Sequence, residues 1–85
     1  MNNNLLPCGS VVQLKEAQRK LMIIGIGVRD GNTNREFDYV AVPYPEGYLG
    51  QEYMFLFNRG DIENIDFLGY VNAEHQAFRA QIAKK

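Results

Sequence analysis

The chain has 85 residues and a formal net charge of −1, and 46% of its residues are hydrophobic, including ten aromatic residues. This length supports one domain, which buries about 60–65% of the surface that its unfolded chain exposes. The apolar fraction excludes an intrinsically disordered protein. We therefore expect residues 1–85 to form a single small globular domain.

Charge is distributed unevenly along the chain. Residues 1–35 carry five Lys/Arg and two acidic residues, residues 36–74 carry one and eight, and residues 75–85 carry three and none. Proteins that bind nucleic acid through its phosphates present a continuous basic surface. The acidic middle of the chain therefore argues against nucleic acid as the partner.

The chain contains one cysteine, Cys8, and one histidine, His75. A single cysteine forms no internal disulfide, and metal sites usually recruit several Cys or His ligands. The first residues lack the basic and apolar segments of a secretory signal, and no window approaches 18 apolar residues. We expect a cytoplasmic protein without a cofactor and without a membrane interaction.

The N-terminal part of the chain predicts a flexible start and one short strand. Residues 1–6 are expected to be flexible. Residues 10–15 are rich in β-branched side chains and follow Pro7 and Gly9, which is typical of a strand. A polar connection follows at residues 16–20.

Residues 20–29 form a nearly continuous apolar run that is too short and too interrupted by glycine for a helix. This pattern predicts a central strand. Gly25 and Gly27 indicate a bend or a bulge within it. Residues 30–34 then supply side chains that tolerate positive φ, so we expect a hairpin turn of about five residues.

Three further strands are predicted at residues 36–42, 53–57 and 65–70. The first of them alternates between its two faces with a period of two. The turn after the second contains Asp61, whose carboxylate suits the cap of a short helical turn. The predicted sheet thus extends over residues 10–70.

A helix is predicted at residues 72–84. Asn72 suits its N-cap, and Phe78 and Ile82 form a narrow apolar stripe that should dock on the sheet. Five strands and one terminal helix predict a mainly β, α+β fold. We expect a small, strongly bent five-stranded antiparallel sheet or an SH3-like barrel, with the helix over one opening.

The segment VPYPEGYLGQEYMFLF, residues 42–57, combines signals of a loop with large apolar side chains. Pro43 and Pro45 fix φ and reduce the entropy that is lost when the loop becomes ordered. We therefore expect this loop to hold one shape.

The aromatic side chains of this loop allow two interpretations. Either Tyr44, Tyr48 and Leu49 fold back over an open end of the sheet and extend its core, or part of this surface stays exposed. Exposed tyrosines combine a large contact area with low side-chain entropy, which is typical of protein interfaces. The sequence favours the first interpretation, and the two are compatible.

The order of residues also resembles a family of short bacterial proteins known as a domain of unknown function, number forty-one seventy-six. The segment Tyr-Pro-Glu-Gly-Tyr-Leu-Gly at residues 44–50 is its most specific part. Further matching residues are Leu6, Pro7, Gly9, Ser10, Val11, Val12, Leu14, Lys15, Lys20, Leu21, Met22, Ile23, Ile24, Gly25, Asp38, Tyr39, Val40, Phe57, Asn58, Asp61, Ile62, Phe67, Gly69 and Tyr70. The resemblance implies a genomic context of type VII secretion and LXG toxins in Gram-positive bacteria, and it implies no catalytic residues.

Together these observations lead to the hypothesis of a non-enzymatic accessory module that binds a protein, as an adaptor or chaperone for a type VII secretion effector. The expected partner is an LXG-type toxin or a secretion component, and the protein itself is expected to be a monomer or a weak homodimer. The candidate binding residues are Tyr44, Glu46, Tyr48, Leu49, Glu52 and Tyr53.

Two alternatives remain open at this point. One is a small ligand-binding barrel or a minor enzyme that uses a cluster of carboxylates. The other is a structural subunit that self-associates through an uncovered edge strand. The carboxylates of the first alternative are Asp38, Glu46, Glu52, Asp61, Glu63 and Asp66.

Overall fold

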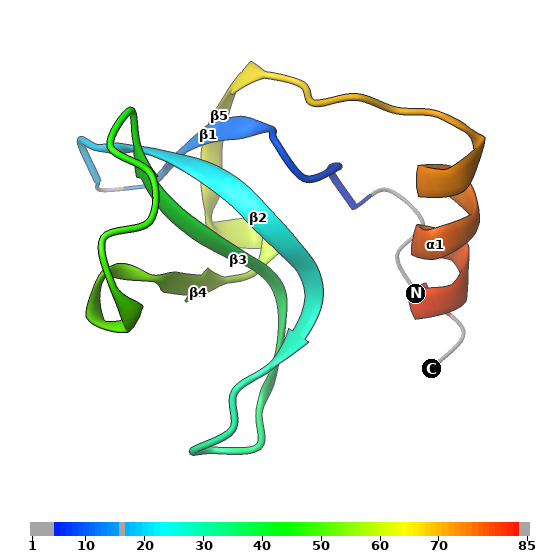
Figure 1. Ribbon diagram of the computed structural model, residues 1–85, viewed down its shortest axis with the longest axis horizontal. Coiled ribbons are helices and arrows are strands. Elements are labelled where there is room, and N and C mark those ends of the chain that lie inside the picture. Colours follow the sequence, from blue (N-terminus) through cyan, green and yellow to red (C-terminus); the bar gives the residue numbers. More distant parts are fainter. Residues whose placement is uncertain (1–4, 16, 84–85) are drawn as a thin grey trace.

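The computed structural model describes residues 5–15 and 17–83 (Figure 1). It contains five strands, two short 3-10 helices and one α-helix, which confirms the predicted mainly β fold with a C-terminal helix. The elements are β1 (Val11–Leu14), β2 (Lys20–Arg29), β3 (Glu36–Tyr44), η1 (Gln51–Tyr53), β4 (Phe55–Phe57), η2 (Arg59–Asp61), β5 (Ile62–Phe67) and α1 (Ala73–Ala83). Strand β5 begins three residues before its predicted start, and Tyr53 belongs to η1 instead of the fourth strand.

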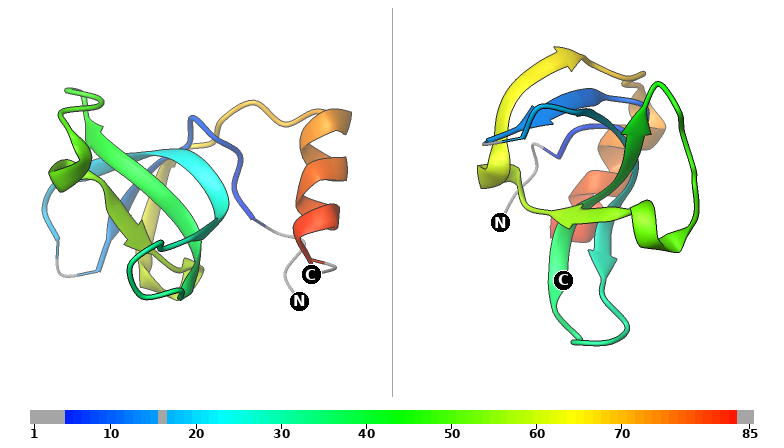
Figure 2. Two further views of the ribbon diagram at one scale, coloured as in Figure 1. Left: turned by 60° about the horizontal axis from the view of Figure 1, so that its bottom comes forward. Right: turned by 90° about the vertical axis from the view of Figure 1, so that its left-hand side faces the viewer.

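The antiparallel sheet is strongly bent. Its strand order is β4-β3-β2-β1-β5, so β4 and β5 form its two edges although only residues 58–61 connect them. In a flat sheet these edges would lie about 19 Å apart. Four residues that include a 3-10 turn span only about 10 Å. The sheet therefore curls until its edges approach each other, as Figure 2 shows, and it remains open because no pairing of β4 with β5 occurs in the described residues.

Hydrogen bonds fix this short connection. The backbone N–H of Asn58 donates to Oδ2 of Asp61 (2.9 Å), which confirms the predicted cap. The N–H of Asp38 on β3 donates to Oδ1 of Asn58 (3.0 Å), and the N–H of Arg59 donates to Oδ2 of Asp38 (2.9 Å). Hydrogen bonds therefore connect the residues of the turn with one another and with β3.

Strand β2 is bent where the sequence predicts it. The pairing of β2 with β3 shifts register between Ile23 and Gly25, and Gly27 has a φ of +61°. A Cβ atom on Gly27 would lie 2.9 Å from Cγ2 of Ile82. Gly27 therefore serves both the bend and the close approach of helix α1.

The core lies on the inner face of the curled sheet and consists of residues of β1, β2, β3 and β4 together with Leu5, while Ile62 of β5 and Ile82 of α1 pack against it. Leu5 is 2% exposed and belongs to this core, and the N–H of Leu6 donates to the hydroxyl of Tyr39 (2.9 Å). The expectation that residues 1–6 are flexible is therefore wrong for Leu5 and Leu6, because the open inner face of the sheet binds them; residues 1–4 lie outside the described residues. The core cluster consists of Leu5, Val12, Leu21, Ile23, Ile26, Tyr39, Ala41 and Phe57.

Helix α1 lies beside the sheet, with the N-terminal segment between them (Figures 1 and 2). Asn72 is its N-cap, as predicted, because Oδ1 of Asn72 accepts from the N–H of His75 (3.0 Å). The expected docking of the apolar stripe occurs only at Ile82, which packs against the core, whereas Phe78 is 48% exposed. The predicted final residue of the helix, Lys84, lies outside the described residues.

The segment after β5 is held to the start of β1. Ser10 is fully buried, and its hydroxyl accepts a hydrogen bond from the N–H of Gly69 (2.9 Å). A Cβ atom on Gly69 would lie 2.5 Å from the carbonyl oxygen of Cys8. The approach of these two backbones therefore requires glycine at position 69.

Replacing Gly69 by alanine should lower the free energy of unfolding by about 2 kcal/mol, because the new methyl group separates the two segments. Gly60→Ala is a matched control, since a Cβ atom there meets nothing within 4 Å and Gly60 has no positive φ. The control should change stability by no more than about 0.5 kcal/mol. Urea denaturation measures both, and equal effects of the two substitutions would contradict the close approach.

Burial raises the pKa of Tyr39 above its ordinary value of 10.0, and this effect exceeds the opposing one of the Leu6 N–H. The unfolded chain therefore loses the tyrosine proton at a lower pH than the folded chain. Stability should be fully present below about pH 10 and fall as the pH rises toward the pKa of the folded state. Urea denaturation between about pH 8 and pH 11 should show a smaller fall for Tyr39→Phe than for the wild type. An identical fall in both proteins would contradict this prediction.

Candidate functional site

The outer face of the sheet carries a row of apolar side chains across four strands. Val42 on β3 pairs with Met22 on β2, Met22 pairs with Val11 on β1, and Val11 pairs with Phe67 on β5. Their chain neighbours Ala41, Leu21, Ile23 and Val12 belong to the core, so this row faces the opposite side. An antiparallel sheet with one solvated face usually has polar residues there. This row is therefore unusually apolar for an outer face.

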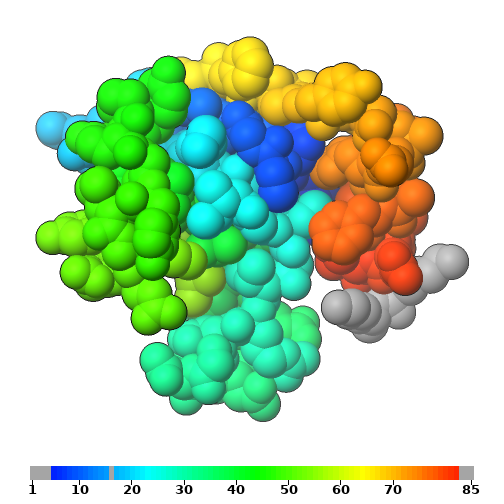
Figure 3. All heavy atoms as spheres, viewed as in Figure 1, coloured from blue at the N-terminus to red at the C-terminus, as the bar shows by residue number. Residues whose placement is uncertain are grey.

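A depression of about 570 Å³ lies over the part of this row that Met22, Val11 and Phe67 form, whereas Val42 is 1% exposed and does not line it. In Figure 3 the surface of β2 (cyan) lies between the loop after β3 (green) and the segment that includes the end of β5 (yellow). Phe67 is 61% exposed and Tyr44 is 47% exposed, so both aromatic rings are accessible at its walls. The lining residues are Gly9, Val11, Lys20, Met22, Tyr44, Asp66 and Phe67.

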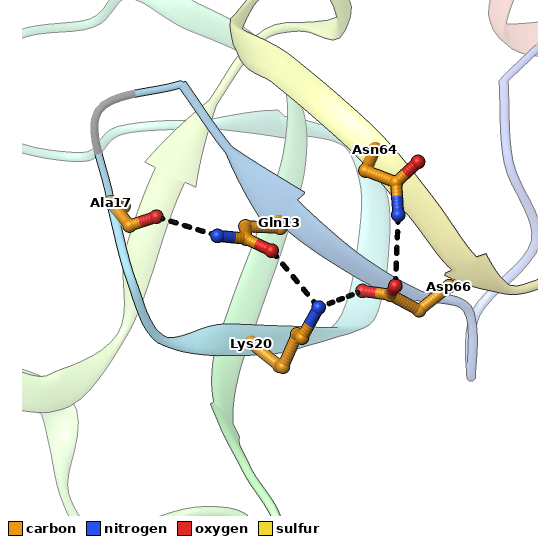
Figure 4. A network of polar contacts seen from close by, with 5 residues as sticks. All are labelled: Gln13, Ala17, Lys20, Asn64 and Asp66. Carbon is orange, nitrogen blue, oxygen red and sulfur yellow. Dashed lines mark hydrogen bonds and ion pairs between the residues drawn. The ribbon is translucent and has the colours of Figure 1, made fainter.

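A polar network from β1, β2 and β5 joins the lining of the depression (Figure 4). Nζ of Lys20 lies 2.8 Å from Oδ2 of Asp66 and donates to Oε1 of Gln13 (2.9 Å). Asn64 donates to Oδ1 of Asp66 (2.9 Å), and Gln13 donates to the carbonyl of Ala17 (3.0 Å). The network orders Lys20 and neutralises its charge. The side chains of Lys20 and Asp66 remain 39% and 29% exposed.

The base of the predicted loop is fixed next to this depression. The N–H of Gly47 donates to the carbonyl of Pro43 (2.7 Å), which closes the turn after Tyr44. Glu46 forms an ion pair with Arg19 of the β1–β2 connection. A hydrogen bond from its own backbone N–H, followed by the bond from Arg19, lowers the pKa of Glu46. The expectation of one loop shape is consistent with these bonds.

The remaining predicted site residues lie farther along the loop. Tyr48, Leu49 and Tyr53 are 65%, 50% and 48% exposed, and Glu52 is exposed on η1. The interpretation that the loop side chains extend the core is therefore wrong for Tyr48 and Leu49, and it is also wrong for Tyr44, which is 47% exposed. The loop runs from the end of β3 to η1 along the side of the sheet (Figure 1), and these side chains stay accessible.

Sequence reasoning identified Tyr44 as a binding residue and named Asp66 among the candidate carboxylates, but it missed the other residues of the depression. Val11, Met22 and Phe67 come from three strands that are separated along the chain, and only the strand register brings them into one row. One signal was present in the sequence. The pairs Val11-Val12 and Leu21-Met22 place apolar side chains on both faces of their strands.

The carboxylates of the ligand or enzyme alternative have different partners. Asp38 and Asp61 accept backbone hydrogen bonds at the β4–β5 connection, whereas Glu46 and Asp66 form separate ion pairs with Arg19 and Lys20. Among residues 5–15 and 17–83, no group of three or more His, Cys, Asp or Glu could hold a metal ion. No helix in the described part of the chain has the length and apolar character needed to cross a membrane.

A family model described as "Domain of unknown function (DUF4176)" matches residues 5–78. The chain belongs to this family. The match confirms the family resemblance seen in the sequence, and it includes all the residues of the depression and of the loop. No curated protein and no solved structure matches the chain.

In this DUF4176 protein, replacing both Tyr48 and Leu49 by serine should leave the free energy of unfolding within about 1 kcal/mol of the wild type, because both side chains are largely exposed. Val42→Ser is the contrasting variant, since Val42 is 1% exposed on the same side of β3. It should cost about 2–3 kcal/mol. Thermal and urea denaturation test the pair, and a comparable loss in the loop variant would place its side chains in the core.

Proposed function

We propose that the protein is a non-catalytic module that binds another protein through an aromatic surface. This aromatic surface consists of the depression together with Tyr44, Tyr48, Leu49 and Tyr53 of the adjoining loop. The observation that carries the proposal is that a segment fixed at its base by a hydrogen bond and an ion pair places the exposed Tyr44 at an apolar depression and exposes further large apolar side chains beyond it. Exposed apolar surface of this kind is typical of protein interaction sites.

The sheet edges support binding through this face instead of through strand pairing. Between Val12 and Val11 the partner on β5 changes from Ile65 to Phe67, so Asp66 lies at a bulge. A second irregularity places Glu63 opposite no residue of β1. Bulges and charges on an edge strand hinder its pairing with another chain. The other edge, β4, has only three residues. A monomer or a weak homodimer fits these edges.

The acidic character of residues 36–74 indicates a second property of the partner, which is a basic surface. Residues 36–74 carry eight acidic residues and one arginine, and this range includes the loop and β5. Glu52 and Glu63 form no ion pair within the described residues. A partner with basic side chains around an apolar centre would therefore be attracted to this surface.

The genomic context that the family resemblance implies indicates which partner to test first. Type VII secretion effectors of the LXG class are synthesised in the cytoplasm before export, and an adaptor or chaperone would bind them there. An acidic, aromatic protein surface suits this role, because an adaptor or chaperone binds its client without catalysing a reaction. An LXG-type toxin is therefore the proposed client.

The proposal predicts that an LXG toxin co-expressed with this protein is captured by the wild type and much less by a variant with Tyr44→Ser and Phe67→Ser. The loss should be at least about tenfold in affinity, because two interface aromatics are removed. Phe78→Ser is the matched control, since Phe78 is 48% exposed but lies on α1. Capture that depends on Phe78 and not on Tyr44 and Phe67 would contradict the proposed surface.

A further inference from the structure

We propose that the depression receives one bulky apolar side chain from an extended segment of the partner, and that Lys20 donates a hydrogen bond to the main-chain carbonyl beside that side chain. This inference rests on the proposed function, and it names the chemistry of the partner. Its basis is the combination of an apolar lining with one ordered ammonium group.

The lining selects an apolar group. Val11, Met22 and Phe67 contribute its hydrophobic surface, and Tyr44 adds an aromatic wall. The volume of about 570 Å³ lies within the range of roughly 300–1,000 Å³ that is usual for pockets that bury small molecules. An aromatic or branched aliphatic side chain therefore fits together with its adjoining main-chain atoms.

Lys20 supplies the polar contact. Its ammonium group has three N–H donors, and the described contacts are with Gln13 and Asp66. One donor is thus left for a ligand at a side chain that is 39% exposed. Because Asp66 already compensates the charge, a neutral carbonyl suits this donor better than a carboxylate, which would also face Asp66.

The proposed hydrogen bond from Lys20 to a main-chain carbonyl favours an extended segment of the partner over a helix. Within a helix each carbonyl before the last turn already accepts from the N–H four residues later, so it is a poorer acceptor for Lys20 than an unpaired carbonyl. In an extended segment the carbonyl groups beside each side chain remain available. The bulge at Asp66 disfavours regular strand pairing along β5, so the segment would lie on the face of the sheet.

The test is an NMR titration of the ¹⁵N-labelled protein with the peptide acetyl-Gly-Phe-Gly-amide. Amide shifts should concentrate at Val11, Met22 and Phe67, and replacement of the peptide phenylalanine by alanine should abolish them. Acetyl-Gly-Phe with a free carboxylate should bind more weakly than the amide peptide. Lys20→Met should weaken binding of the amide peptide by about threefold to tenfold. Lys15→Met is the control, because Lys15 is exposed in the β1–β2 connection and does not line the depression.

Absence of shifts at these three amides, or tighter binding of the carboxylate peptide, would overturn the inference. The comparisons of peptides use the wild-type protein, so they decide the question even if Lys20→Met folds poorly. If toxin capture depends on Tyr44 and Phe67 but the peptide does not bind, the inference about the bound side chain is wrong and the proposed function is not affected. If the peptide does not bind and toxin capture does not depend on Tyr44 and Phe67, the proposed function is wrong as well.

Discussion

The shape of the protein depends on the four-residue connection between β4 and β5. These strands form opposite edges of a five-stranded sheet, and so short a connection is possible only if the sheet curls. Hydrogen bonds among Asn58, Asp61 and Asp38 hold the connection and attach it to β3. The curl gives the sheet a concave inner face, which forms the core, and a convex outer face, which a chain of this size covers only in part.

The two faces are completed differently. The inner face is closed by Leu5 and by Ile82, which come from the two ends of the described chain. On the outer face, Val40 and Val42 of β3 are buried, whereas the apolar row reaches the exposed ring of Phe67. The depression therefore follows from the way in which a small curled sheet distributes its limited apolar surface. Its location between an ordered loop and a network that holds Lys20 makes it suited to recognition.

The sequence was informative where the determining interactions are local. The bend in β2 follows from glycines, the N-cap of α1 from Asn72, and the capped turn from Asp61. The aromatic site was predicted only in part, because Tyr44, the last residue of β3, belongs to a recognisable sequence segment whereas Val11, Met22 and Phe67 meet through strand register. Leu5 was assigned to a flexible segment because its place in the core depends on a cavity formed by distant strands. The incomplete docking of α1 likewise depends on tertiary packing at Phe78.

Hydrogen–deuterium exchange of the protein alone and in complex with its captured toxin tests most directly whether the outer face is the binding surface. We expect complex formation to slow exchange at residues 9–11, 20–22 and 66–67, which include lining residues of the depression, and at residues 44–49 of the adjoining loop. Exchange in α1 should stay unchanged. Protection confined to α1 or to the edge strand β4, with unchanged exchange around the depression, would contradict binding through the outer face.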